Sequence, residues 1–223
     1  MTRLLRAFFL VAAALACAAC SRTADVSANG RHPWTHPGEL RVATVASINT
    51  LNPILSTIST EAFAQQFVLE PLIATAPDGQ DVPVLASIVP TLANGGISRD
   101  GLTITYHLRH GVHWHDGAPF TSRDVQFSVA AIMNRATNVT SQHGYDDIAR
   151  VDTPDLYTAV FHLKKPFAPA VDTFFATSDT PYFVLPAHLL AKYHDLNHVP
   201  FNVHPIGTGP FKLVRWVRGD RIE

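Results

Sequence analysis

Residues 102–125 read LTITYHLRHGVHWHDGAPFTSRDV, and this stretch combines a strand, a turn and the start of a helix. Its first half alternates apolar and polar residues, and this period of two predicts a strand with one buried face. The apolar members are Leu102, Ile104, Tyr106 and Leu108. Asp116-Gly117 is a turn dipeptide, so we expect the chain to reverse direction there.

A helix is predicted directly after this turn. Thr121 is a good N-cap residue, and Asp124 stands three positions later, where its side chain can reach back to the cap. Apolar residues then recur on one helical face, at Val125, Val129, Ile132 and Met133. The stretch therefore predicts a strand, a turn and a capped helix in succession.

Related patterns predict elements on both sides of this stretch. Residues 40–45 alternate and predict a first strand, and Ser59 or Thr60 can cap a helix with Phe63 and Phe67 on its inner side. We also expect a strand over 157–163, a helical stretch over 171–176, a short helix from 186, and a strand over 211–217 that turns into a return arm over 221–223. A return arm of three residues leaves most of its partner's backbone groups unpaired. We therefore expect this sequence to be the N-terminal part of a longer protein.

The first 19 residues predict a signal peptide rather than a part of the fold. Arg3 and Arg6 precede an apolar run that is too short to span a bilayer. Small residues then lead to Cys20, which resembles a bacterial lipoprotein processing site, so Cys20 would carry lipid. Cys17 is an alternative acceptor, and a simple secretory signal with two incidental cysteines is the other interpretation. Residues 20–38 are rich in small and polar residues and predict a flexible tether.

Composition narrows the class of partner. The formal net charge is −1 and the sequence has no basic patch, so nucleic acid is not an expected partner. Both cysteines lie in the predicted leader, so the exported chain must be held by its core without a disulfide. Hydrophobic residues make up 47% of the chain, which is ample for a globular core.

No pattern in the sequence predicts catalysis or a metal site. There is no Gly-x-Ser-x-Gly elbow, and Asp146 and Asp147 are adjacent, so their side chains cannot face a common point. His113 and His115 would share a strand face, but a closed metal site needs three or four ligands. We therefore expect no catalytic residue, no metal ligand and no cofactor.

Residues 102–125 as a whole resemble the most recognisable segment of the extracellular solute-binding proteins of ABC importers, family 5, which bind dipeptides, oligopeptides or nickel. Ser122 replaces the usual alanine of that pattern, on a first helical turn that we expect to be solvated. Three further segments resemble the family: Leu51-Asn52-Pro53, Glu70-Pro71-Leu72 and Gly207-Thr208-Gly209-Pro210, the last being a tight turn before a strand. Together the matches cover residues 40–223.

The resemblance implies an α/β fold with mixed α+β sheets, similar to class II periplasmic binding proteins and incomplete. Residues 39–52 and 179–223 would belong to the first lobe, and residues 53–178 would form an inserted subdomain. The second lobe would be absent from this sequence.

The same resemblance implies the ligand-capturing component of an ABC importer for peptides or related small solutes. Its expected partners are a small peptide or related solute, an ABC permease in the inner membrane, and the membrane itself through a lipid anchor on Cys20. We expect a monomer in the periplasm or cell envelope. Two alternatives remain open: an exported lipoprotein scaffold or chaperone-like module with the same fold, and a secreted hydrolase whose catalytic residues lie beyond residue 223.

Two loops would line the ligand cleft of such a protein. The first follows the predicted first strand, and the second follows the capped helix. The candidate ligand-binding residues are Asn52, Ser56, Thr57, Ile58, Ser59 and Tyr145. Tyr145 is a candidate because an aromatic ring with a hydroxyl can both stack on a ligand and hydrogen-bond to it. The alternative for Tyr145 is a half-buried tyrosine that packs on the capped helix.

Overall fold

The computed structural model describes residues 35–177 and 182–223. The predicted signal peptide, Cys17, Cys20 and most of the predicted tether lie outside these residues. The chain divides into two compact units, Met1–Ala43 and Thr44–Glu223. Residues 35–43 contain a turn in which the Glu39 N–H donates to the His36 carbonyl at 3.2 Å. In the part of the chain that is described, no helix is long and apolar enough to cross a membrane.

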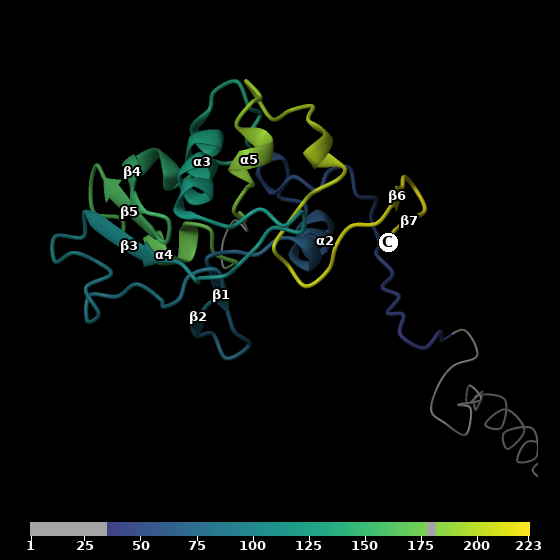
Figure 1. Cartoon of the computed structure of the whole chain (residues 1–223), viewed down its shortest axis with the longest axis horizontal. Helices are drawn as coiled ribbons and strands as arrows, with labels where there is room; N and C mark the ends of the chain where they lie inside the picture. The colour runs from purple at the N-terminus through teal and green to yellow at the C-terminus, as the bar shows by residue number, and fades with distance from the viewer. Residues whose placement is uncertain (1–34, 178–181) are drawn as a thin grey trace, which may run out of the picture. The chain divides into compact units, whose positions relative to one another are not determined.

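The larger unit contains a three-stranded antiparallel sheet. Its order is β3 (Thr103–His107), β5 (Thr158–Leu163) and β4 (Ile148–Asp155) (Figure 1). The predicted alternation of β3 is confirmed, because Ile104 and Tyr106 are buried between less buried neighbours. Strand β5 is also confirmed. Strand β4 was not predicted from the sequence.

Helix α3 (Ser122–Met133) packs against β4 and β5. The predicted cap is confirmed on the Asp124 side, because Asp124 Oδ2 accepts a hydrogen bond from the Thr121 N–H at 2.8 Å. Val125 and Ile132 are fully buried, as their spacing predicted. The expectation of a solvated Ser122 is wrong. Ser122 is buried, and its hydroxyl donates to the Asp155 carbonyl at 2.5 Å, which joins the helix to β4.

Helix α2 (Ser59–Val68) follows the short 3-10 helix η1 (Pro53–Leu55). The predicted inner face of α2 is wrong, because the side chain of Phe63 is 43% exposed and Phe67 is only partly buried. The buried positions are instead Glu61, Ala62, Gln65 and Val68. The buried face thus combines two small apolar side chains with two polar ones, and Glu61 is held there by the N–H groups of Asn49 and Thr50. The ribbon of β1 (Ile73–Thr75) and β2 (Asp81–Pro83) comes next.

The hydrophobic core is one cluster that runs from Ile54 to Phe201. Aromatic rings dominate it, and the Phe161 and Phe174 rings stack with their centroids 5.5 Å apart. Short elements complete this region: η2 (Tyr145–Asp147), α4 (Ala170–Thr173), α5 (Ala187–Leu190) and η3 (Pro200–Asn202). The start and the end of the region meet where the Leu51 N–H donates to the Asn202 carbonyl at 2.8 Å.

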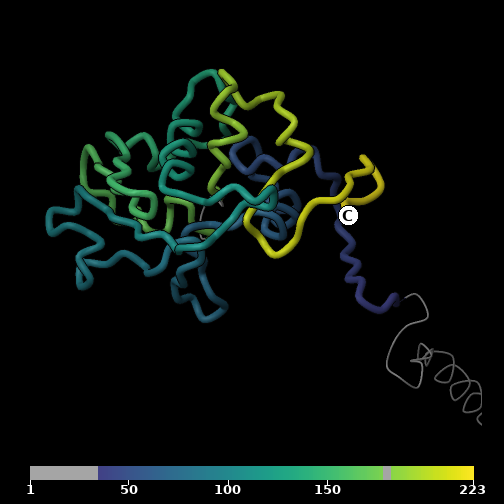
Figure 2. Tube along the Cα trace, viewed as in Figure 1, coloured from purple at the N-terminus to yellow at the C-terminus, as the bar shows by residue number. Residues whose placement is uncertain are grey.

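The Gly207–Gly209 segment runs along the end of helix α2 (Figure 2). The Gly209 N–H donates to the Val68 carbonyl at 2.9 Å, and the His115 N–H donates to the Gly207 carbonyl at 2.8 Å. A Cβ atom on Gly207 would lie only 1.7 Å from the Val68 carbonyl oxygen. The segment therefore needs glycine because the two backbones touch, and it is more than a tight turn before a strand.

One predicted strand is absent from the structure, and another is shorter than expected. Residues 40–45 form no strand, and Val45 is exposed. An alternating segment becomes a strand only beside a partner edge, and no described strand pairs with this one. The predicted strand over 211–217 is limited to β6 (Trp216–Val217), which pairs with β7 (Arg221–Ile222) across the predicted turn.

Candidate functional site

The two loops predicted to line a ligand cleft lie side by side. The Thr140 N–H donates to the Ile54 carbonyl at 3.1 Å, so the loop after α3 is tied to η1. Tyr182 secures the same loop, because its hydroxyl accepts from the Ser141 N–H at 2.9 Å and donates to the Ser141 carbonyl at 2.8 Å. The fold thus brings together segments that are about 85 residues apart in sequence.

Four of the six predicted ligand residues form one continuous stretch, Ser56–Ser59, which is exposed except for the half-buried Ser56 and which we call the open segment. The backbone is extended at Ser56, with φ −153° and ψ 142°, and at Ile58, with φ −68° and ψ 125°. Within the described residues, the backbone groups of Ser56 and Thr57 form no hydrogen bonds. Thr57, Ile58 and Ser59 are exposed. The backbone of Ile58 is engaged, because its N–H donates to Ser56 Oγ at 3.1 Å and its carbonyl accepts from the Glu61 and Ala62 N–H groups. The free backbone groups are therefore those of Ser56 and Thr57, beside hydroxyl groups and one exposed apolar side chain.

Asn52 lies beneath the open segment and is fully buried. Its side-chain oxygen accepts from the Ile54 N–H at 3.3 Å, which caps η1. Its side-chain nitrogen donates to Asn202 Oδ1 at 2.9 Å. These contacts use its amide inside the protein, so the structure favours a role in positioning the loop rather than in touching a ligand.

Tyr145 is buried in the core and is only 1% exposed. Its hydroxyl accepts from the Phe175 N–H at 2.9 Å and donates to the Thr173 carbonyl at 3.3 Å. Burial raises the pKa of Tyr145 well above its usual value. The ring contacts Phe174, Phe175 and Tyr182. The structure therefore favours the packing role that the sequence left open, with Tyr145 more deeply buried than that alternative assumed.

A hollow of about 260 Å³ lies next to the open segment. Leu55, the last residue of η1 and the residue before the open segment, is one of its lining residues. We call it the amide hollow, because three asparagines line it. Its lining residues are Asn49, Thr50, Leu55, Asn197, His198, Val199, Asn202, Val203 and Arg218. These residues come from three separate segments of the chain. Sequence reasoning assigned none of its polar residues to a ligand site, and no spacing pattern connects them.

Glu61 of helix α2 holds two lining residues of the amide hollow, Asn49 and Thr50. It is 1% exposed, and its Oε1 accepts from the Asn49 N–H at 2.5 Å and from the Thr50 N–H at 3.3 Å. A buried carboxylate that accepts two backbone N–H groups holds the loop in one geometry. The conformation of residues 49 and 50 is therefore set by a residue of the helix that follows the open segment.

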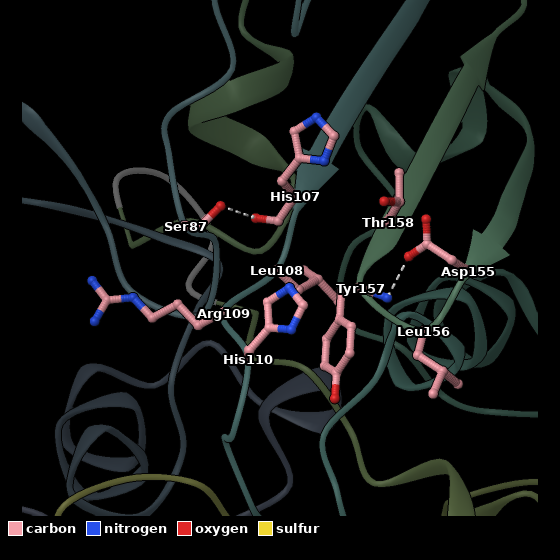
Figure 3. A pocket seen from close by; sticks show the side chains of 9 residues that line it. All are labelled: Ser87, His107, Leu108, Arg109, His110, Asp155, Leu156, Tyr157 and Thr158. Carbon is pink, nitrogen blue, oxygen red and sulfur yellow. Dashed lines mark hydrogen bonds between the residues drawn. The ribbon is translucent and has the colours of Figure 1, made fainter.

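A larger hollow of about 740 Å³ lies at the end of β3 and the start of β5 (Figure 3). Its principal polar groups are already engaged within the protein. Arg109 donates to the Pro83 and Ala86 carbonyls and is directed away from His110 and Tyr157, whose rings stack at 3.9 Å. The Asp155 carboxylate accepts from the Tyr157 N–H at 2.7 Å, and Ser87 donates to the His107 carbonyl. These contacts fasten two turns together.

His113 and His115, which precede the turn at Asp116-Gly117, have separate roles. His113 Nδ1 hydrogen-bonds to the Gly111 carbonyl at 2.9 Å. His115 instead contacts the glycine segment, with Nδ1 accepting from the Gly207 N–H at 3.3 Å and Nε2 bonding to the Gly209 carbonyl at 2.8 Å. In residues 35–177 and 182–223, no three metal-binding side chains are grouped to hold an ion.

Comparison with known proteins gives a match over most of the described fold. A sequence model described as "Bacterial extracellular solute-binding proteins, family 5 Middle" matches residues 87–223. Protein XP55 of Streptomyces lividans is 32% identical over 213 residues, which cover 95% of this chain and 36% of that protein. The glutathione-binding protein GsiB of Salmonella choleraesuis is 29% identical over 127 residues, which cover 57% of this chain and 23% of that protein.

A solved structure supports the same relationship. The crystal structure of NikZ from Campylobacter jejuni in complex with Ni(L-His) aligns with a TM-score of 0.68 and 31% sequence identity. The alignment covers 79% of this chain and 33% of NikZ. The chain thus spans about a third of the length of Protein XP55 and of NikZ.

Proposed function

The chain belongs to the bacterial extracellular solute-binding proteins of family 5, and from this premise we propose that it is part of the ligand-capturing component of an ABC importer for peptides or related small solutes. The family is one of binding proteins rather than enzymes. The family match and the glutathione-binding relative favour neither a scaffold nor a hydrolase.

The observation that carries the proposal is the open segment. An extended stretch with unbonded backbone donors and acceptors can pair with the main chain of a peptide in the manner of an added strand. The hydroxyls of Ser56, Thr57 and Ser59 add further hydrogen-bonding groups, and the exposed side chain of Ile58 adds an apolar contact. Main-chain pairing of this kind recognises peptides without requiring one particular side chain.

In this proposal the six predicted residues divide into two groups. Ser56, Thr57, Ile58 and Ser59 contact the solute. Asn52 and Tyr145 hold the loops in place from beneath, through the hydrogen bonds to Asn202 and Phe175. Residues 39–52 and 179–223 belong to the first lobe, residues 53–178 form the inserted subdomain, and a second lobe outside these 223 residues closes over the solute.

Closure would link capture to transport. A ligand that contacts both lobes stabilises the closed form, because only that form offers both sets of contacts. A permease in the inner membrane would then receive the closed form. A lipid on Cys20 would keep the monomeric protein in the periplasm or cell envelope, close to its permease. No cofactor is needed for any of these steps.

Substitution of Thr57 by tryptophan tests the proposal, because Thr57 is exposed and a large ring would block main-chain pairing. In the protein encoded by the complete reading frame, we expect Thr57→Trp to weaken the affinity for peptides about tenfold or more, the equivalent of at least one net hydrogen bond. Calorimetric titration with a peptide panel would measure this.

The matched control is Gln66→Trp, which places the same ring on an exposed position of helix α2 away from the open segment. The control should leave the affinity unchanged. Equal affinities for the Thr57→Trp variant and the native protein would contradict the proposed binding surface.

A further inference from the structure

The ring of His115 forms two hydrogen bonds of opposite polarity with the glycine segment, Gly207–Gly209. The Gly207 N–H donates to Nδ1 at 3.3 Å, so Nδ1 offers a lone pair and carries no proton. Nε2 lies 2.8 Å from the Gly209 carbonyl oxygen, which can only accept, so Nε2 carries the proton and donates it. The two contacts together therefore require one form of the ring, the neutral tautomer with its proton on Nε2.

A positively charged His115 ring cannot make both contacts. In the imidazolium form both nitrogens carry protons, so the Nδ1 proton would face the Gly207 N–H, one donor against another. Gly207 is buried, and among residues 35–177 and 182–223 its N–H has no acceptor other than His115 Nδ1. A buried N–H group without an acceptor is unfavourable. Protonation of the ring therefore removes the bond to Gly207 and leaves the bond to Gly209 in place.

The glycine segment has little room to shift toward another acceptor. On one side it is pressed against the end of α2, where a Cβ atom on Gly207 would lie only 1.7 Å from the Val68 carbonyl oxygen. On the other side the His115 N–H donates to the Gly207 carbonyl at 2.8 Å, and Lys212 Nζ donates to the His115 carbonyl at 3.1 Å. Of these contacts, only the bond to Nδ1 is lost when the ring takes up a proton.

The charged groups next to His115 do not offset a charge on its ring. Lys212 adds a positive charge from the side of the glycine segment. The Asp116 carboxylate is already engaged, because it pairs with His188 Nε2 of α5 at 2.8 Å and accepts from the Ala118 N–H at 3.1 Å. A proton on His188 would strengthen its contact with Asp116, so this second histidine responds to acid in the opposite direction.

The remaining ionisable groups of this region are also engaged or unpaired with the ring. The Asp124 carboxylate of α3 accepts from the Thr121 and Ala187 N–H groups, and His113 Nδ1 bonds to the Gly111 carbonyl. Glu70 follows the end of α2. Across the described residues, His115 forms no ion pair with Glu70 or with any other carboxylate.

We propose that His115 is a proton-sensitive latch, which holds the turn at Asp116-Gly117 to the glycine segment in its neutral form and releases Gly207 when its ring takes up a proton. Histidine side chains change charge between about pH 5 and 8, and His115 is only half-buried, so protons from solvent can reach it. Release would loosen the backbone from Gly207 to Phe211, whose N–H donates to the Phe67 carbonyl. This inference goes beyond the proposed function and needs no ligand.

Hydrogen exchange tests the latch in the protein encoded by the complete reading frame. The protection factors of the amides of residues 207–211, which correct for the intrinsic pH dependence of exchange, are measured at about pH 8 and about pH 5. We expect protection to fall about tenfold at the lower pH, the equivalent of one lost buried hydrogen bond. Amides of the sheet formed by β3, β5 and β4 serve as the internal reference and should change much less.

Variants connect this effect to His115. In His115→Gln the side chain still offers one acceptor and one donor but does not titrate, so protection of residues 207–211 should be the same at both pH values. His115→Ala lacks both groups and should give weak protection at both. His188→Gln is the matched control, because it removes the other histidine of this region and should retain the tenfold fall.

Three results would overturn the proposal. They are equal protection of residues 207–211 at both pH values in the native protein, a fall that persists in His115→Gln, and a fall that disappears in His188→Gln. If His115→Gln does not fold, nitrogen NMR of the native protein takes its place. The His115 ring should then pass from the Nε2–H form to the doubly protonated form over the same pH range in which protection is lost, and a mismatch between the two ranges contradicts the latch.

Discussion

Asp124 is one carboxylate that joins two distant parts of the chain. Its Oδ2 accepts from the Thr121 N–H at 2.8 Å, and its Oδ1 accepts from the Ala187 N–H at 2.9 Å. The side chain thus connects the start of α3 to the start of α5. Burial raises the pKa of Asp124, and the hydrogen bonds it accepts only partly oppose this effect.

The raised pKa of Asp124 predicts a pH dependence of stability. The folded protein holds the Asp124 proton more tightly than the unfolded chain does, so this contribution is present below the unfolded pKa of about 3.9 and is lost as the pH rises through the folded pKa. Asp124→Asn cannot titrate. The free energy of unfolding of the native protein minus that of the variant should therefore fall as the pH rises from about 4.

Chemical denaturation of both proteins at a series of pH values measures this difference. A difference that stays constant, or that grows with pH, would show that the pKa of Asp124 is not raised. Asp124→Ala serves as a second variant. It leaves two backbone N–H groups without their acceptor and should cost about 2–6 kcal/mol, on the basis of about 1–3 kcal/mol for each unsatisfied group.

A substitution at Tyr145 tests whether this residue contacts the solute or only supports the fold beneath the predicted ligand site. Tyr145→Phe keeps the ring and removes the acceptor of the buried Phe175 N–H. We expect the free energy of unfolding to fall by about 1–3 kcal/mol and the peptide affinity of the folded protein to stay unchanged. Thermal denaturation and calorimetric titration measure the two quantities. A loss of affinity without a loss of stability would instead place the hydroxyl on the ligand.

At the scale of elements, the sequence was most informative where local signals agree. The alternation of β3, the turn at Asp116-Gly117 and the capped helix α3 each have a short-range cause, and all three are found in the structure. Strand β4 lacks such a signal, because its buried positions do not alternate and its pairing with β5 is irregular. On helix α2 the phenylalanines were expected inside, and only packing against the rest of the chain shows that Glu61 and Gln65 take that place.

The contact between Gly207 and helix α2 gives a prediction at this scale. A Cβ at residue 207 would overlap the Val68 carbonyl, and the obstacle is backbone that cannot rotate away. We expect Gly207→Ala to destabilise the protein by at least about 3 kcal/mol, at the severe end of overpacking. Thr208→Ala, one residue away, is the control and should cost much less. Thermal denaturation measures the effect. If Gly207→Ala has the same melting temperature as the native protein, the two segments separate at little cost and the prediction is wrong.

At the scale of the whole molecule, the candidate site was only partly predictable. The open segment begins three residues after Pro53 of the Leu51-Asn52-Pro53 motif, so a local motif was enough to find it. The amide hollow combines Asn49, His198 and Arg218, which lie up to 169 positions apart. Such a set is assembled by the fold, and no periodicity or spacing within the sequence could have revealed it. The burial of Asn52 and Tyr145 follows in the same way from the packing of distant segments.

The hydrogen bond from Leu51 to Asn202 has a consequence for how this architecture can change over evolutionary time. Leu51 and Asn202 flank residues 52–201, so the two ends of that block are neighbours in space, as chain ends are in domains that tolerate insertions. Genetic exchange can therefore replace or resize the block between them while the flanks keep their register. Lineages that diversify in this way would vary most in the length of that block and least at its two junctions.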